Sequence, residues 1–512
     1  MQKFLIKISI ISVIIFTASC TKLDNQLNGS LPDIGGGPSA GGPAVVAPLL
    51  KATYVAFRNP YQDQARLWCL QEHTSDEAVG PTRGGDWDDN GIWRVLHSHQ
   101  WDADHGFIRD TYSDLGRIIF NGTDILRLSP SAQQEAEARF LRAFATLSML
   151  DGWDQCPYRE PGGNPSENPK VRKGVVALDW IIAEVNAAMP NLPSGAANIA
   201  NKNAAKVLLM KCYLNKAIYA NRTTPVFAAA DMNQVISLAD QLITSGTYSL
   251  SANIFDNFAP NNEAISTENI FTFLNIGGSE SGNVRSRWFS TLHYNQNPSG
   301  WNGFTTLSDF YSKFEAVDKR RGGNPYPGMT NGILPGFLVG QQFTGAGVPL
   351  KDRKNNPLIF TPAVALKEAG NNLEVTGIRV VKYPIDYTSG DNANNDYVLF
   401  RYSDVLLMKA EALLRGGTAT VVAPTTALAA VNMVRSRVSA TTLATVSLDQ
   451  LSDERGREFY WEGMRRTDMV RFGKFLAPRV LKSGTSDSKY LLFPIPNQQL
   501  AINPNLVQNP GY

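Results

Sequence analysis

Apolar residues recur at three- and four-residue spacing in several stretches of the chain, and this period predicts amphipathic α-helices. Within residues 204–219, for example, Val207, Met210, Leu214 and Ile218 fall on one face of a helix. The predicted helical stretches of the first half are 49–70, 108–147, 175–189, 204–219 and 236–243, the last ending at Gly246. A loop rich in Pro and Gly, residues 157–169, interrupts them.

The helical pattern returns at Tyr402 and continues in a second helix around residues 428–438. Small residues such as Ala204, Ala239 and Ala410 lie where neighbouring helices would approach each other. The pairing of helices indicates tetratricopeptide-like packing, although no strict 34-residue repeat is present. The sequence therefore predicts a mainly α fold built from degenerate helix pairs.

A charged stretch from Asp453 to Phe472 follows directly and mixes carboxylates, arginines and aromatic residues. Read as one helix, it places Glu462 and Arg466 on the same stripe as Phe459 and Met469. An ordinary amphipathic helix with exposed ion pairs is one interpretation. The other, which we favour, is a set of paired and partly buried charges that ties the last helices to the scaffold.

Two regions break the helical pattern and carry clustered aromatic residues. Residues 72–105 contain Trp87, Trp93 and four of the five histidines among turn-forming residues, and residues 251–398 read as loops and short strands around Trp288 and Trp301. Long irregular segments in a compact protein often carry function, and exposed rings stack on sugars or aromatic ligands. If the two regions meet in space they line one face; otherwise each is a local plug of the core.

The composition narrows the class of ligand only weakly. With 48 basic and 46 acidic residues the net charge is +2, which gives no electrostatic reason to expect nucleic acid as a partner. The 42 Gly and 29 Pro indicate many loops between the ordered elements. Recognition is therefore expected to depend on local chemistry.

Two metal sites can be considered in the first aromatic region, and we assign neither. Asp86, Asp88 and Asn90 match the first half of a calcium loop, but the twelfth position is His97 where a bidentate Glu is needed, so an Asn-Gly turn is the simpler interpretation. His97 and His99 would share one face of a strand, close to Asp102, Asp104 and His105. No cofactor is predicted.

The N-terminus has the pattern of a bacterial lipoprotein. Lys3 and Lys7 precede an apolar run that ends in Thr17-Ala18-Ser19-Cys20, so residues 1–19 are expected to be a signal peptide and Cys20 the lipidated first residue. Residues 20–48, rich in Gly and Pro, would be a flexible tether that holds a body of residues 49–512 near a membrane. Cys69, Cys156 and Cys212 imply no disulfide framework.

Several motifs, most of them near the C-terminus, resemble the SusD/RagB family of outer-membrane lipoproteins from Bacteroidetes. The matching segments are 401–412 (RYSDVLLMKAEA), Asn432 with Arg435 and Arg437, 454–468 (ERGREFYWEGMRRTD), Pro494-Ile495-Pro496, and 508–512 (QNPGY), with 137–143 and 246–250 upstream. The resemblance covers nearly all of the mature chain and divides the body into 49–250, 251–398 and 399–512.

The resemblance implies a SusD-like fold in which degenerate tetratricopeptide-like helix pairs support a loop-rich face with a few short strands. It also implies a protein that is not an enzyme, anchored to the cell outer membrane and exposed at the surface, that binds a glycan, or in some members a peptide, and passes it to a SusC-like TonB-dependent transporter. The quoted motifs are structural, so the candidate ligand-binding residues come from the loops. They are Trp87, Trp93, Trp288, Tyr294 and Trp301 for stacking, and Arg83, Asp86, Asn90 and Asn302 for hydrogen bonds.

Two other functions remain open at this stage. A glycoside hydrolase would need two carboxylates at a defined separation, for which Glu77 and Asp86 are candidates. A peptide-capturing protein would use the same loops on a different ligand.

Overall fold

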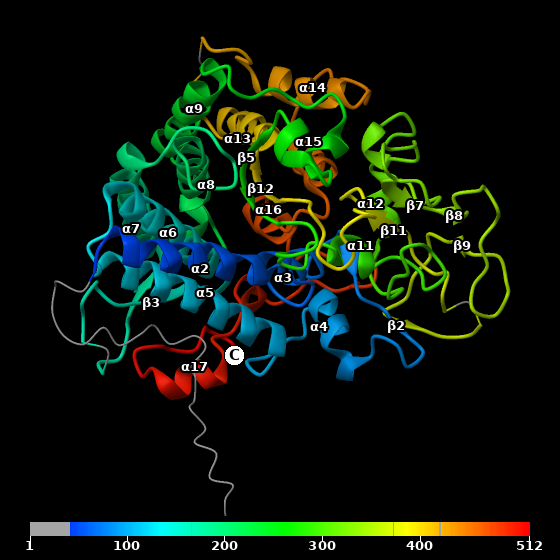
Figure 1. Cartoon of the computed structure of the whole chain (residues 1–512), viewed down its shortest axis with the longest axis horizontal. Helices are drawn as coiled ribbons and strands as arrows, with labels where there is room; N and C mark the ends of the chain where they lie inside the picture. The colour runs from blue at the N-terminus through cyan, green and yellow to red at the C-terminus, as the bar shows by residue number, and fades with distance from the viewer. Residues whose placement is uncertain (1–40, 165, 372, 419–420) are drawn as a thin grey trace, which may run out of the picture. The chain divides into compact units, whose positions relative to one another are not determined.

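Helices form one side of the fold and lie next to one another in nearly the order of the chain. In the computed structural model, which describes residues 41–512 except positions 165, 372, 419 and 420, α5 packs on α6, α6 on α7, α7 on α8, α8 on α9, α9 on α13 and α13 on α14 (Figure 1). The helices of this row are α5 (Gly106–Leu126), α6 (Ala132–Trp153), α7 (Gly174–Ala188), α8 (Lys202–Ala220), α9 (Ala229–Thr244), α13 (Tyr402–Leu414) and α14 (Ala427–Arg437). The predicted helical packing is confirmed.

Local sequence signals explain where several of these helices begin. Ser131 and Gln134 form a capping box at the start of α6, in which each side chain hydrogen-bonds the other residue's backbone N–H. Asn201 caps α8 and Thr426 caps α14 with side-chain oxygens. These caps satisfy backbone N–H groups that have no partner within the helix.

The first helix, α2 (Pro43–Gln62), begins six residues before the expected start of the body at Leu49. The predicted helix 49–70 is broken at Asp63, where the backbone is extended, and resumes as α3 (Leu67–Glu72). The expected signal peptide, the lipidation site at Cys20 and the tether up to residue 40 lie outside the described residues. Residues 41–512 form one compact unit, in which Cys69, Cys156 and Cys212 are buried free thiols.

The region between β5 and β12 is irregular, as predicted, and it is held together by pairs of short strands. Within the described residues, β1 pairs with β6, β3 with β4, β7 with β11, β8 with β9 and β5 with β12 in antiparallel fashion, and β2 pairs with β10 in parallel. The strands are β1 (Ala78–Val79), β2 (Thr82–Arg83), β3 (Gln155–Tyr158), β4 (Lys170–Lys173), β5 (Asn269–Phe273), β6 (Thr305–Thr306), β7 (Gly336–Leu338), β8 (Gly340–Gln341), β9 (Ile359–Phe360), β10 (Lys367–Glu368), β11 (Arg379–Val381) and β12 (Tyr397–Arg401). Most of them lie far from their partners in sequence.

Shorter helices and helical turns complete the fold. They are η1 (Asp89–Gly91), α4 (Ile92–Ser98), η2 (Met189–Asn191), η3 (Ile254–Phe258), α10 (Asn262–Ile265), α11 (Ser286–Phe289), α12 (Ser308–Ser312), η4 (Lys319–Arg321), α15 (Leu448–Phe459), α16 (Arg465–Arg471), η5 (Ser488–Leu491) and α17 (Asn497–Ile502). No helix in the described part of the chain combines the length and the apolar character needed to span a membrane.

The charged stretch 453–472 is not one helix, as its pattern suggested, but two helices joined by a sharp turn. The helix α15 ends at Phe459 and α16 begins at Arg465, and between them Trp461 (φ 65°) and Gly463 (φ 78°) adopt left-handed backbone conformations. Glu72 on α3 accepts hydrogen bonds from the N–H groups of Gly463 and Met464, and thereby holds the turn. In Figure 1 both helices lie between the helical row and the strands β7 to β9.

The expectation that the charges of this stretch are buried and paired is confirmed. Three carboxylates spaced four residues apart, Glu454, Glu458 and Glu462, are buried, and we call them the carboxylate ladder. Each carboxylate of the ladder pairs with two or three cations. Glu454 pairs with Arg320, Arg435 and Arg457. Glu458 pairs with Arg320, Arg401 and Arg437, and Glu462 pairs with Lys382 and Arg401.

The pairing is strong enough to keep the middle rung, Glu458, ionised. Burial by itself would raise the pKa of Glu458, but Arg437, Arg401 and Arg320 outweigh it and hold that pKa well below its usual value. Arg401 reaches two rungs at once, because its guanidinium contacts Glu458 and both oxygens of Glu462. The ladder therefore joins α14, α15 and the irregular region in one ionic cluster.

Replacing Glu462 by Ala is expected to lower the free energy of unfolding by about 3–5 kcal/mol, because it removes a buried partner from Arg401 and Lys382. Chemical denaturation followed by circular dichroism measures the loss. The matched control is Glu135→Ala, which breaks an i,i+4 pair with Arg139 on the surface of α6 and should cost less than about 1 kcal/mol. Equal stability losses in the two variants would contradict the structural role of the ladder.

A second buried pair of carboxyl groups makes stability depend on pH. Burial raises the pKa of Glu72 to about 7, and burial together with the charge of Glu72 raises the pKa of Glu77 well above its usual value. Glu77 accepts a hydrogen bond from the backbone N–H of Trp461, so both carboxyls hold the turn between α15 and α16. Folding thus favours the protonated form of the pair.

Because both pKa values are higher in the folded than in the unfolded chain, the pair contributes most to stability at acidic pH and its contribution falls as the pH rises through about 7. We expect Glu77→Gln, which keeps an oxygen for the Trp461 N–H and removes one charge, to melt at a higher temperature than the parent at about pH 9 and to gain less at about pH 5. Thermal melts across this range measure the difference. A gain that is the same at every pH would argue against a shared buried proton.

Candidate functional site

The two aromatic regions meet in the structure, and Trp87 and Trp301 are the residues that join them. The indole Nε1 of Trp87 donates a hydrogen bond of 2.9 Å to the carbonyl oxygen of Trp301, and the two ring centroids lie 6.1 Å apart. Trp301 is 41% exposed and Trp87 is half-buried. Segments more than 200 residues apart thus share one surface, which we call the aromatic face.

Paired strands carry the two loops to this position. Trp87 follows β2 by four residues, and Trp301 precedes β6 by four. Because β1 pairs with β6, and β2 pairs with β10, three distant segments are fixed beside one another. The backbone hydrogen bonds of these pairs set the register at which the loops leave the fold.

The aromatic face rests on a floor of buried rings. Trp93 is buried, donates from Nε1 to Asp89 (2.8 Å), and lies with its ring centroid 5.4 Å from that of Trp87 and 4.9 Å from that of Phe304. The ring of Phe304 also lies 4.9 Å from the Trp87 ring. Trp93 therefore supports the face from below and does not present a stacking surface.

Three further residues proposed from the sequence are placed inside the protein. Trp288 is only 2% exposed, so it cannot stack on a ligand in this structure. Asn302 is 1% exposed and its side chain accepts a hydrogen bond from Arg379 (2.7 Å). Arg83 is buried and donates to the backbone carbonyls of residues 373 and 376, and burial lowers its pKa to about 10. These polar groups are used to hold the loops, since buried donors must be satisfied internally.

Phe289 belongs to the aromatic face, although the sequence did not single it out. Its half-buried ring meets Trp301 edge to face, with centroids 4.9 Å apart, and the guanidinium of Arg285 lies over it at 4.7 Å. Phe289 directly follows the buried Trp288 in the short helix α11. In so short a helix the sequence offers two neighbouring rings and no period long enough to tell which one faces outward.

A polar corner lies beside the rings and consists of Tyr294, Asp86, Arg353 and Glu374. The hydroxyl of Tyr294 donates to Oδ2 of Asp86 (2.8 Å), and the guanidinium carbon of Arg353 lies 3.9 Å from the centre of the Tyr294 ring. Burial, reinforced by Asp86, raises the pKa of Tyr294 to about 12, so the phenol remains a donor at neutral pH. Arg353 lies before β9 and Glu374 lies after β10, in segments of the irregular region that the sequence analysis did not single out.

The loop backbone is strained where it carries these groups. Trp87, Asp89 and Asn90 adopt positive φ angles of 60°, 40° and 55°, and Asn302 has φ 53°. Left-handed conformations cost non-glycine residues about 1–3 kcal/mol each and persist only where the surrounding structure enforces them. Asn90 itself is exposed in its turn, where it is free to contact a ligand. Contacts with the surrounding structure therefore impose the conformation of this loop.

The residues considered for metal binding point to separate partners. His97 and His99 do not lie on a strand: His97 belongs to α4 and contacts the carbonyl of Val480 (2.8 Å), whereas His99 follows the helix and contacts Thr74 and Ser486. Asp88 pairs with Arg94 (2.6 Å). Among the described side chains, no group of three or more His, Cys, Asp or Glu is arranged to hold a metal ion.

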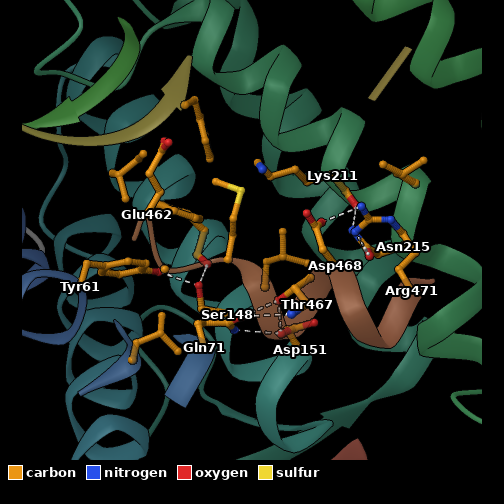
Figure 2. A pocket seen from close by; sticks show the side chains of 18 of the residues that line it. Tyr61, Gln71, Ser148, Asp151, Lys211, Asn215, Glu462, Thr467, Asp468 and Arg471 are labelled. Carbon is orange, nitrogen blue, oxygen red and sulfur yellow. Dashed lines mark hydrogen bonds and ion pairs between the residues drawn. The ribbon is translucent and has the colours of Figure 1, made fainter. Parts of the chain in front are cut away.

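A partly open cavity of about 130 Å³ is a second candidate site, and it lies beside the ionic core (Figure 2). Its polar walls are already paired: Tyr61 with Ser148 (2.5 Å), Thr467 with Asp151 (2.8 Å) and Asn215 with Arg471 (3.1 Å). Glu462 and Asp468 also line it, so it borders the ladder and α16. Such a space is large enough for several water molecules, which fits hydration of buried charges better than capture of a polymer.

The chain is similar in sequence to proteins of a known family. The model of the SusD family matches residues 253–490. A curated relative, the starch-binding protein SusD of Bacteroides thetaiotaomicron, is 25% identical over 474 aligned residues, which cover 83% of this chain and 82% of that protein.

Solved structures share the fold over nearly the whole chain. A laminarin-binding SusD-like protein superimposes with a TM-score of 0.69 at 21% identity, covering 92% of this chain and all of that one. The surface glycan-binding protein A of Bacteroides thetaiotaomicron, solved in complex with laminarihexaose, gives a TM-score of 0.67 at 17% identity and covers 91% of this chain and 99% of that one. Residues 253–490 thus match the SusD family, the chain is similar to the curated SusD over most of its length, and it has the fold of SusD-like proteins.

Proposed function

We propose that this protein is a lipid-anchored surface protein that binds oligosaccharides or polysaccharides at the aromatic face. The observation that carries the proposal is the joining of Trp87 and Trp301 from distant loops, next to Phe289 and the polar corner. Sugar rings present C–H groups that pack on aromatic rings and hydroxyls that bond to carboxylates and guanidinium groups. The aromatic face offers both kinds of contact at one surface.

Relatives support the same class of ligand. The curated relative is described as starch-binding, and two proteins of the same fold are described as laminarin-binding and as a glycan-binding protein in complex with laminarihexaose. These relatives are described as binding proteins, and binding without hydrolysis is what we propose here. Glu77, one carboxylate considered for hydrolysis, is buried against the turn at Trp461 and cannot reach a surface ligand.

The anchor and the partner complete the proposal. Lipidation at Cys20 would hold the protein at the outer membrane through the segment up to residue 40. A SusC-like TonB-dependent transporter would receive the glycan, as the family resemblance implies. The ligand-contacting residues that we propose are Trp87, Phe289, Tyr294, Trp301, Asp86, Asn90 and Arg353.

Replacing Trp301 by Ala is expected to weaken glycan binding at least about tenfold, which corresponds to roughly 1.4 kcal/mol, because it removes the most exposed ring of the face. Isothermal titration against a panel that includes starch, laminarin and peptides measures the change. Phe120→Ala is the matched control, since Phe120 is an exposed ring on helix α5, outside the face. Binding of peptides with no binding of any polysaccharide would contradict the proposal.

Gly303→Ala tests whether the position of Trp87 matters without removing a ring. A Cβ at residue 303 would come within 2.3 Å of Cε2 of Trp87 and within 2.8 Å of the carbonyl oxygen of Ser290, so the indole must leave its present position. We expect an altered near-ultraviolet circular dichroism spectrum and glycan affinity reduced about fivefold or more, with a stability loss of about 1–3 kcal/mol from overpacking. Gly85→Ala, in the Trp87 loop but with no atom within 4 Å of its added Cβ, should leave spectrum and affinity unchanged.

A further inference from the structure

The charge of Arg353 is neutralised before any ligand arrives, although its side chain is 50% exposed. Its Nε donates to Oε1 of Glu374 (2.6 Å), and its backbone N–H donates to Oε2 of the same carboxylate (3.0 Å). The guanidinium carbon lies over the ring of Tyr294, 3.9 Å from its centre. Arg353 is therefore held in one orientation, with its outer N–H groups available to a ligand.

A buried histidine fixes Glu374 in turn. Nε2 of His293 lies 2.8 Å from Oε2 of Glu374, and Nδ1 accepts a hydrogen bond from the N–H of Asn295 (3.0 Å). The proton of the neutral ring is thus on Nε2, and burial lowers the pKa of His293 so that the ring stays neutral. Burial alone would raise the pKa of Glu374, but the hydrogen bonds from Arg353 and His293 outweigh it and lower that pKa. Glu374 is ionised and balances Arg353.

Another guanidinium group near the rings is also paired. Arg285, which stacks on Phe289, forms an ion pair with Asp391. Arg353 also lies 3.5 Å from Asp86, which accepts the Tyr294 hydroxyl. Lys351 and Lys354 are exposed next to Arg353 in the sequence and are the cations that the experiment must test separately.

A ligand with carboxylate groups would have to compete with Glu374 and Asp86 for the guanidinium of Arg353, and it would meet the repulsion of both. A neutral hydroxyl has no such conflict, because it can donate to Asp86 while it accepts from Arg353. We propose that Arg353, held by Glu374, is the specificity-determining residue that makes the aromatic face select neutral glycans over anionic ones. The inference rests on the proposed function, since it concerns the ligand class of the same site.

The test compares each polysaccharide of a neutral panel with its own carboxymethylated derivative, so that the two polymers share the same sugar backbone and linkages. With wild type we expect the native polymer to bind at least about tenfold more tightly than its derivative. We also expect its affinity to be nearly unchanged between about 20 mM and 500 mM NaCl, because no net charge attraction is involved. Affinity electrophoresis or isothermal titration provides the values.

Glu374→Gln should raise the affinity for the carboxymethylated polymer about tenfold relative to the native one, because Arg353 loses its internal counter-charge. Glu135→Gln on the distant helix α6 removes the same net charge and should leave the ratio of the two affinities unchanged. If Glu374→Gln unfolds in a thermal melt, Asp86→Asn at the exposed edge of the corner tests the same repulsion and should shift the ratio in the same direction.

The outcomes separate the two proposals. Failure of every polysaccharide to bind wild type overturns the proposed function. Tighter binding of the carboxymethylated polymer to wild type, lost in a Lys351→Gln and Lys354→Gln double variant, overturns the inference and assigns anion recognition to the lysines. An unchanged ratio in Glu374→Gln and Asp86→Asn also overturns it, while glycan binding itself stands.

Discussion

The interaction on which the rest of this structure depends is the carboxylate ladder of Glu454, Glu458 and Glu462 with its arginines. A buried charge is tolerated only when its partners are present and well oriented, so each rung requires cations from elsewhere in the chain. Those cations come from η4, α14 and the segments around residues 382 and 401. The ladder therefore fixes where the irregular region lies against α15, a task that its short strands, two to five residues long, would perform only weakly alone.

A short chain of contacts connects the ladder to the aromatic face. Glu462 holds Lys382, which directly follows β11, and Arg379 at the start of β11 donates to the side chain of Asn302. Asn302 is the neighbour of Trp301 and adopts a left-handed conformation that the fold imposes. The strained loops can keep one shape because a rigid ionic cluster lies beneath them. Rings and donors ordered before binding lose less entropy when a ligand arrives.

The same principle of internal pairing operates at the core and at the surface, with opposite consequences. Inside, paired arginines such as Arg401 provide cohesion without leaving an uncompensated charge. At the aromatic face, pairing of Arg353 with Glu374 leaves a guanidinium that can donate hydrogen bonds but attracts anions only weakly. Under the function and the selectivity that we propose, this pairing lets the protein expose an arginine to the hydroxyl groups of a neutral glycan and discriminate against anionic ones.

The sequence by itself determined the helical scaffold, the resemblance to the SusD/RagB family and the paired nature of the charged stretch. Helical period depends on residues three and four apart, and the family motifs are contiguous, so both are readable without a structure.

The positive φ angle of Trp461, which breaks the stretch into α15 and α16, was not readable, because contacts with residues as distant as Glu72 and Glu77 enforce it. Only the tertiary structure decided which rings face outward: Trp301 is exposed and Trp288 is not. It also brought Arg353 and Glu374 to Tyr294, and Phe289 to Trp301. Burial and contact between remote segments are properties of the whole fold, whereas composition and spacing report only on neighbours in the chain.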